Sequence, residues 1–435
     1  MEAERNLRVK PAGASDSGVA FMLRALRYRN YRLFFGGQIV SLLGTWITTT
    51  ATSWLVYRLT HSAVLLGLVG FAGQFPAFLL GPFAGILVDR WDRRKLLVGT
   101  QTVSMLQSFL LAALTLSGRI TIEAIVLLSI LQGLVNAFDM PGRQAFVIAL
   151  IENKADLGNA IALNSSMVNV ARLLGPSIAG AVIAATSEGW CFLIDGVSYV
   201  GVIAALLLMR VPARAASARP RALEQLMEGV RYAFGFSPIR SIMLLLALVS
   251  LVGVPYSVLM PIFATTVYHG GPHTLGLLMT ASGAGALIGA LFLARRRSVV
   301  GLGRFIVIAS ALFGAGLTAF SFSRVLWLAL PCLVVAGFGF MGQMAASNTI
   351  IQTIVDDAKR GRVMSFYMMA FLGTAPFGSL MAGWLSSRIG APHTLLVGGI
   401  SCLAGAAWFA GRLPALRTLV RPIYVDLGIL PQLIE

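Results

Sequence analysis

Twelve long apolar runs divide this chain, and they constrain its fold more than any other feature. A bilayer core about 30 Å thick needs about 20 helical residues to cross it. Backbone polar groups cannot reach water inside lipid, so each run is expected to be a helix. The sequence therefore predicts an all-α polytopic membrane protein with twelve transmembrane helices. The predicted helices are 33–57, 63–87, 96–117, 121–142, 159–186, 190–210, 238–266, 272–294, 303–322, 325–347, 362–387 and 392–411.

Charge is sparse and confined to short segments. Of 435 residues, 57% are hydrophobic and 12% are charged, whereas a soluble protein carries about 25% charged residues. The net charge of +17 comes from loops rather than from a basic stripe, so we expect a lipid bilayer and no nucleic acid as partner. With both termini cytoplasmic, 29 of the 34 Lys and Arg fall in cytoplasmic segments. Omitting one helix would destroy this asymmetry, which supports the count of twelve.

The helices group as six plus six, in two pseudo-repeats. Shifting the chain by 204 residues places Gly85 on Gly289 and Arg93 on Arg297. Repeats of this kind bind substrate between the two halves near the bilayer midplane and alternate by rocking. The predicted parts are a cytoplasmic tail at 1–32, a six-helix bundle at 33–210, a cytoplasmic linker at 211–237, a second bundle at 238–411 and a cytoplasmic tail at 412–435.

A Gly-x-x-x-Asp-Arg segment with a following basic cluster lies between the second and third helices. Gly85 allows a neighbouring helix to approach closely. Asp89, at the membrane edge, suits hydrogen bonds from a helix N-terminus or an arginine. Arg90, Arg93 and Arg94 fix the side of the membrane. The segment is therefore a candidate gate, and the alternative is a loop that only sets topology.

This segment resembles the signature of the major facilitator superfamily, except that Asp92 stands where the signature has Gly. Residues 30–34, 139–145 and 172–176 narrow the likeness to the bacterial branch that contains the enterobactin exporter and macrolide-efflux proteins. The resemblance implies proton-driven efflux of a siderophore, antibiotic or other small organic molecule across a bacterial inner membrane, and we expect a monomer. Nutrient uptake by proton symport and a sensor without transport remain the alternatives.

The fifth helix contains Arg172 followed by Gly175-Pro176 and Gly180. Proline inside a helix leaves a carbonyl without its donor and permits a bend. The pattern resembles the antiporter motif of the superfamily's exporters, and its alternative is a small-residue packing face. Arg172 is the one basic residue placed deep in the membrane, where it could bind a substrate anion or hydrogen-bond neighbouring carbonyls.

Polar side chains recur at helical spacing in the first helix, which predicts that they share one face. Such a stripe either lines a wet cavity or packs against another helix. In the superfamily, helices 1, 4, 7 and 10 line the central path, so the resemblance implies further candidates. The predicted substrate-binding residues are Gln38, Thr45, Thr48 and Thr52, with Ser41 on the same face, and Gln132, Asn136, Tyr256 and Gln343.

Two membrane acids are candidates for proton coupling. Asp139 and Arg143 are one turn apart and could form an ion pair. Asp195 is a weaker candidate for the proton site, and its depth differs from that of Arg172 by about 13 Å, so we expect no pair between them. The first helix contains no acid, and the proton carrier stays open.

Enzyme chemistry has no residues to support it in this sequence. There is no phosphate-binding Gly-x-x-x-x-Gly-Lys-Ser/Thr segment. The four histidines lie in or near predicted outer loops without metal-ligand spacing. The three cysteines lie far apart inside apolar runs, which indicates neither a disulfide nor a metal site. We therefore expect a protein that is not an enzyme and needs no metal or cofactor.

Overall fold

The computed structural model describes residues 23–151, 153, 156–209, 234–296 and 298–431, except the side chains of residues 82, 85, 86, 89, 90, 357 and 358. These ranges form helices and connecting turns, without strands. Twelve spans in them are long and apolar enough to cross a membrane. The predicted all-α fold with twelve membrane helices is confirmed.

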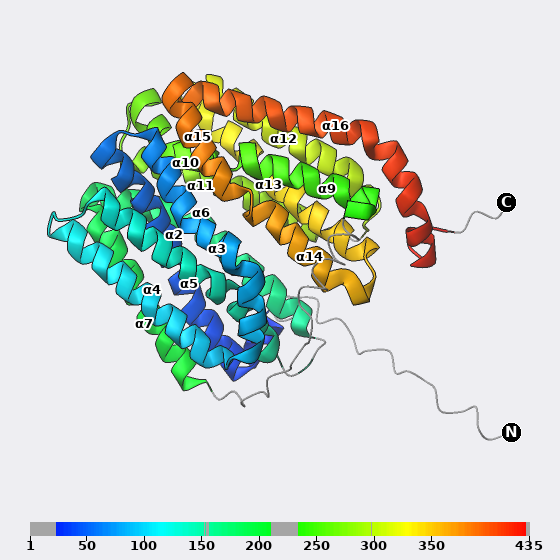
Figure 1. Cartoon of the computed structure of the whole chain (residues 1–435), viewed down its shortest axis with the longest axis horizontal. Helices are drawn as coiled ribbons and strands as arrows, with labels where there is room; N and C mark the ends of the chain where they lie inside the picture. Colours follow the sequence, from blue (N-terminus) through cyan, green and yellow to red (C-terminus); the bar gives the residue numbers. More distant parts are fainter. Residues whose placement is uncertain (1–22, 152, 154–155, 210–233, 297, 432–435) are drawn as a thin grey trace.

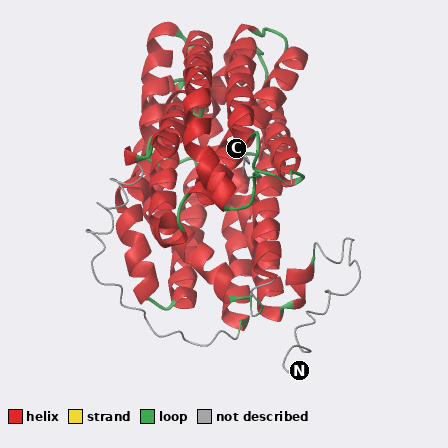
Figure 2. Ribbon diagram, turned by 90° about the vertical axis from the view of Figure 1, so that its right-hand side faces the viewer, coloured by secondary structure: helices red, strands yellow, loops and turns green. Residues whose placement is uncertain are grey.

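The chain builds two bundles, seen in Figure 1 as a blue-to-green half and a green-to-red half. The first contains η1 (Arg24–Arg27), α2 (Arg29–Thr60), α3 (Ala63–Arg90), α4 (Arg93–Leu116), α5 (Ile122–Ala149), α6 (Leu157–Ala185) and α7 (Glu188–Leu208). The second contains α9 (Ser237–Leu248), η3 (Val249–Gly253), α10 (Tyr256–Ile262), η4 (Phe263–Val267), α11 (Pro272–Ala294), α12 (Leu302–Phe322), α13 (Leu326–Ile354), α14 (Asp357–Leu372), α15 (Ala375–Ile389) and α16 (Ala391–Asp426). Figure 2 shows the helices running side by side along the long direction of each bundle.

At two predicted boundaries the helix extends beyond the most apolar residues. α2 begins at Arg29, inside the predicted tail 1–32, and α16 continues to Asp426, through most of the predicted tail 412–435. In α16 the buried side chains of Leu416 and Val420, one turn apart, continue the packed face past the apolar run. Most of the predicted linker 211–237 and of the N-terminal tail lies outside the described residues.

The seventh span is interrupted by π-helical segments, η3 and η4. Pro255 follows η3 and has no N–H with which to bond the carbonyl of Leu251. That carbonyl instead faces α15, where a Cβ on Gly378 would lie 2.2 Å from its oxygen. A glycine is required at this contact, because any side chain would push α15 away from the broken helix.

The two bundles meet along two helix pairs, α3 with α15 and α6 with α11. A Cβ on Gly67 would lie 2.5 Å from the Ser379 carbonyl oxygen and 3.0 Å from Cα of Gly383. A Cβ on Gly180 would lie 3.3 Å from Cα of Gly276. All four glycines lie in the terminal two turns of their helices, at the end of the molecule that holds the α2–α3 turn. The matching pairs confirm the predicted repeat.

Gly67→Ala is expected to force α3 and α15 apart, because the atoms that meet the new methyl group belong to backbone. Overpacking of this kind costs about 1–3 kcal/mol, so the melting temperature of the purified protein should fall. Spin labels on His61 and Pro392 should report a longer distance. Gly81→Ala on the same helix is the control, since a Cβ there meets nothing within 4 Å. Equal behaviour of the two variants would contradict the tight crossing.

The segment before α2 is docked on the start of α6 rather than free at the membrane surface. Asp156, which is buried, accepts a hydrogen bond from the Tyr28 hydroxyl at 2.6 Å and lies 2.8 Å from Arg24 Nε. Arg27 makes a second ion pair with the same carboxylate. The Tyr28 hydrogen bond, with the charges of Arg24 and Arg27, lowers the pKa of Asp156. The depressed pKa means that this docking is favoured when Asp156 is ionised.

Acidification is therefore expected to release residues 24–28. Because the folded-state pKa of Asp156 is lowered, its contribution is complete above the ordinary aspartate pKa, about 3.9, and is lost as pH falls through the folded value. The anisotropy of a dye attached at position 23 should drop over that range. Asp156→Asn should give a low dye anisotropy already at neutral pH. Asp92→Asn, which changes an aspartate in another turn, should keep the high anisotropy of the wild type. A high value in Asp156→Asn would contradict this docking.

Candidate functional site

The turn between α3 and α4 is organised by the residue that departs from the superfamily signature. Asp92 caps α4, accepting hydrogen bonds from the backbone N–H groups of Arg94 at 2.9 Å and Lys95 at 3.1 Å. Arg93 donates to the carbonyl of Ala145 at 3.0 Å and Arg94 to that of Leu207 at 2.5 Å. The predicted gate thus ties α4 to α5 and α7. The side chains of Gly85, Asp89 and Arg90 lie outside the described residues.

A buried ion pair occupies the interior of the first bundle. Asp139 and Arg143 pair across one turn of α5, with their side chains 3% and 23% exposed, so the predicted pair forms. From α4, Thr100 Oγ1 and Gln101 Nε2 donate to Asp139 Oδ1 at 2.9 and 2.8 Å. From α2, the Gln38 amide oxygen, assigned by its hydrogen-bonding environment, accepts from Arg143 Nη1 at 2.8 Å and Nε at 2.9 Å. This ion-pair cluster joins α2, α4 and α5.

The polar stripe of α2 packs against the first bundle instead of lining an open path. Gln38 and Ser41 are buried. Thr45 Oγ1 lies 3.4 Å from the hydroxyl of Tyr199 on α7. Thr48 lies near Asp195, although its hydroxyl has no hydrogen bond among the described residues. These four residues of the stripe therefore lie at contacts between helices. The fifth, Thr52, is half-buried.

Asp195 differs from Asp139 in having no ion pair with a cation among the described residues. Its Oδ2 accepts a hydrogen bond from Ser108 of α4 at 2.9 Å, and its Oδ1 is buried without a partner among the described residues. A Cβ on Gly44 would lie 2.5 Å from that Oδ1. Tyr199 lies within electrostatic range of Asp195, Asp139 and Arg143. A buried carboxyl without a cation is costly when charged, so this group is chemically suited to gain and lose a proton.

Arg172 contacts both halves of the molecule. Its guanidinium carbon lies 5.7 Å from the ring centre of Trp46 on α2 and 5.4 Å from that of Phe340 on α13. Both separations are in the range of cation–π attraction, which is strongest away from water. No ion pair joins Arg172 to Asp195 in the described part of the chain. The arginine is thus held between aromatic rings at the junction of α2, α6 and α13.

The antiporter-like motif forms close helix contacts. A Cβ on Gly175 would lie 2.5 Å from the Cβ of Trp46. The carbonyl oxygen of the next residue, Pro176, would lie 2.8 Å from a Cβ on Gly276 of α11, and Gly180 faces the same helix. The motif is a small-residue packing face that also forms part of the junction between the halves.

The remaining predicted substrate residues lie within bundles. Gln132 donates to Ser104 and to Asn136, both at 3.2 Å. The hydroxyl of Tyr256 bonds that of Ser282. Gln343 is fully buried, and neither of its amide atoms has a hydrogen-bond partner among the described residues. Among the described residues these candidates make separate contacts within their own bundles.

Sequence reasoning missed the polar face of α4. Gln101, Ser104 and Ser108 are buried and recur at spacings of three and four, the same signal that identified the α2 stripe. Through Gln101 and Ser108 this face holds both membrane acids. Among the described residues no group of three potential ligands could hold a metal ion.

Comparison with known proteins assigns the family. A family model described as transmembrane secretion effector, of the major facilitator type, matches residues 21–420. The chain belongs to this family. As a secretion-effector-type transporter it is a multi-pass membrane protein and not an enzyme, and the expected likeness to the efflux branch is confirmed.

Relatives of this secretion-effector family member include a transporter and an efflux protein. The staphyloferrin A transporter of Staphylococcus aureus is 28% identical over 396 residues, covering 88% of this chain and 96% of the relative. Macrolide efflux protein A of Streptococcus pyogenes is 22% identical over 87% of this chain and 96% of its own length. A solved bacterial homologue of the lysosomal transporter Spinster matches with a TM-score of 0.65 at 16% identity, covering 94% of this chain and 99% of that one, which shows the shared fold.

Proposed function

We propose that this transporter is a proton-coupled exporter of a small organic molecule, a siderophore or a drug such as a macrolide, that works by alternating access. It acts as a monomer in a bacterial cytoplasmic membrane, with both termini in the cytoplasm. The named relatives, a siderophore transporter and a macrolide efflux protein, support the substrate class. The excess of Lys and Arg in one set of loops supports the orientation.

The observation that carries the proposal is buried Asp195, whose Oδ1 has no hydrogen-bond partner in the part of the chain that the structure describes. Between residues 238 and 411 the chain has acids only at positions 356 and 357, which precede and begin α14. Membrane carboxyls are thus confined to the first bundle, on α5 and α7. Asp139 is neutralised by Arg143, whereas Asp195 is not paired and can carry a proton. Asp195 is therefore the proposed proton carrier, with the ion-pair cluster as its neighbour.

Substrate binds, in this proposal, between the halves at Arg172. The guanidinium lies between Trp46 and Phe340, one from each bundle. Such a site offers a positive charge for a carboxylate or phenolate and two aromatic faces for an apolar body. Entry of substrate would separate Arg172 from one ring and so bias the position of the halves, which pivot at the two glycine crossings.

The test uses inverted membrane vesicles loaded with a pH-sensitive dye and energised before addition of siderophores and macrolides. The wild type should release protons from the vesicle lumen when its substrate is added. Arg172→Ala should weaken the response by raising the substrate concentration needed, because it removes the cation and both ring contacts. Arg388→Ala, which removes a guanidinium that lies over the ring of Trp384 on its own helix, is the matched control.

The outcomes separate the functions. A substrate-evoked proton release supports antiport. If substrate instead evokes proton entry into the vesicle lumen, and if substrate accumulates in whole cells, the two move in the same direction. This result would indicate symport. Absence of any response, with the protein verified in the membrane, would refute coupling for the compounds used. An unchanged concentration dependence in Arg172→Ala would remove Arg172 from the substrate site.

A further inference from the structure

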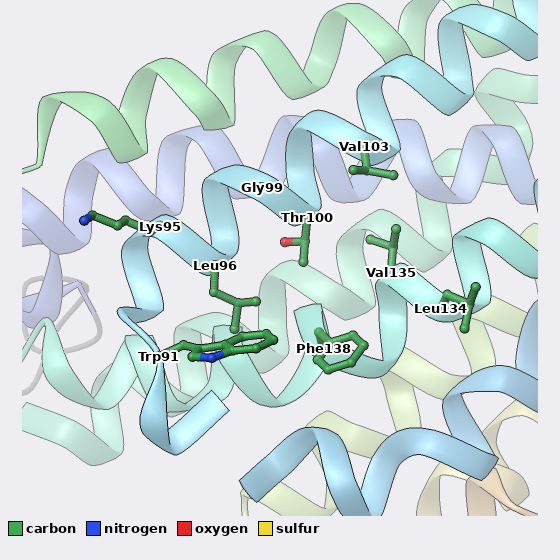
Figure 3. A pocket seen from close by; sticks show the side chains of 9 residues that line it. All are labelled: Trp91, Lys95, Leu96, Gly99, Thr100, Val103, Leu134, Val135 and Phe138. Carbon is green, nitrogen blue, oxygen red and sulfur yellow. The ribbon is translucent and has the colours of Figure 1, made fainter. Parts of the chain in front are cut away.

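A groove on the outer surface of the first bundle runs between α4 and α5, with a volume of about 370 Å³. Figure 3 shows its apolar walls, among them Leu96, Val103, Val135 and Phe138. The ring of Trp91 stacks on Phe138 with centroids 6.1 Å apart and closes one side. Val103 and Leu134 are 37% and 38% exposed. The two halves are joined by α3 with α15 and by α6 with α11, and not by α4 or α5. The groove between α4 and α5 therefore faces lipid.

One end of the groove carries a positive charge. Lys95 lies in the first turn of α4, and Figure 3 shows its ammonium group beyond the apolar residues, directed away from them. Its side chain is exposed and has no hydrogen bond or ion pair among the described residues. The neighbouring Arg93 and Arg94 are bonded to carbonyls of α5 and α7, and the Asp92 carboxylate is bonded to backbone N–H groups. The Lys95 ammonium is therefore a cation that a ligand can reach.

We propose that this groove binds one anionic phospholipid, with its phosphate at Lys95 and one acyl chain along α4 and α5. Three features fit this occupant. From Lys95 to Val103 the helix rises about 12 Å, which stays within one leaflet of a core about 30 Å thick. Trp91 lies at the headgroup end, where tryptophan is favoured. The positive N-terminus of α4 and the ammonium complement an anionic headgroup.

The groove also reaches the ion-pair cluster. Thr100 forms part of its floor, and the hydroxyl of the same residue donates to Asp139 Oδ1 at 2.9 Å. A bound acyl chain packs against the side chain that holds Asp139. The lipid site is independent of the transported substrate, and its test does not require export.

The test measures quenching of Trp91 fluorescence by phospholipids with brominated acyl chains, added to the purified full-length protein in detergent. The part of the signal due to Trp91 is the difference from Trp91→Phe. Brominated phosphatidylglycerol should quench Trp91 with about fivefold higher apparent affinity than brominated phosphatidylcholine of the same chains, since a surface cation contributes about this factor. Lys95→Gln should remove the preference. Arg304→Gln, at the third residue of α12 as Lys95 is of α4, should keep it.

A second variant tests the groove itself. A Cβ on Gly99 meets nothing within 4 Å, so Gly99→Leu should fold normally while filling the groove, and quenching of Trp91 by both lipids should fall. Gly411→Leu, equally open on α16, should behave as wild type. Equal affinities for the two lipids would overturn the headgroup assignment, and unchanged quenching in Gly99→Leu would show general contact with surrounding lipid only.

Discussion

Asp195→Asn is expected to abolish substrate-driven proton movement while the protein still folds and binds substrate. Asparagine has the shape of aspartate and can still accept the hydrogen bond from Ser108, so stability should change by about 1 kcal/mol or less. It cannot release a proton, and the vesicle dye response should fall to that of vesicles without the protein. Substrate binding to the purified variant should stay within about twofold of wild type, because the site at Arg172 does not contact Asp195.

Ser108→Ala is the matched control for this prediction. It removes the hydrogen bond to Oδ2 but leaves the carboxyl group in place. We expect proton movement to continue, with a loss of about 1 kcal/mol in stability. Normal proton movement in Asp195→Asn would exclude Asp195 as the carrier and would direct attention to Asp139.

Asp139→Ala is expected to be the most destabilising single change in the first bundle. It leaves the Arg143 guanidinium, 23% exposed, without its carboxylate, and removes the acceptor for Thr100 and Gln101. Breaking a buried ion pair in this way costs about 3–5 kcal/mol. Thermal unfolding of the purified protein measures the loss.

Neutral substitutions of Asp139 and Arg143, made singly and together, test whether the two residues stabilise the protein as an ion pair or independently. The double variant Asp139→Asn with Arg143→Gln should recover most of the stability lost in either single neutral variant, because no unpaired charge remains. Gln38 can still hydrogen-bond an amide at position 143. Strict additivity of the two single losses would show that the residues are not coupled.

The fold could be predicted from sequence because the bilayer imposes it. Apolar length and the Lys/Arg asymmetry require helices of known number, whatever their detailed packing. The ends were harder: α16 continues to Asp426 because Leu416 and Val420 find packing partners, which hydropathy does not report. The Asp139–Arg143 pair was predictable because it is local, one turn apart on a single helix.

The candidate site was predicted less well because its contacts join different helices. Spacing placed Gln38, Thr45 and Thr48 on one face, but it could not say which helix that face meets. The structure turns the face toward α5 and α7, and the polar face of α4 completes the contacts. The neighbours of Arg172, Trp46 and Phe340, lie far away in sequence, so the ring contacts required the tertiary structure.

The glycine crossings at the α2–α3 end determine how contacts between the two halves respond to salt and pH. Contacts between Gly67 and Gly383, and between Gly180 and Gly276, consist of Cα atoms and backbone carbonyls. Such van der Waals contacts contain no titratable atom and no ion pair, so ionic strength and acidity on that side of the membrane should neither tighten nor loosen them. The two glycine contacts themselves are thus insensitive to the salt and acidity of the adjoining medium.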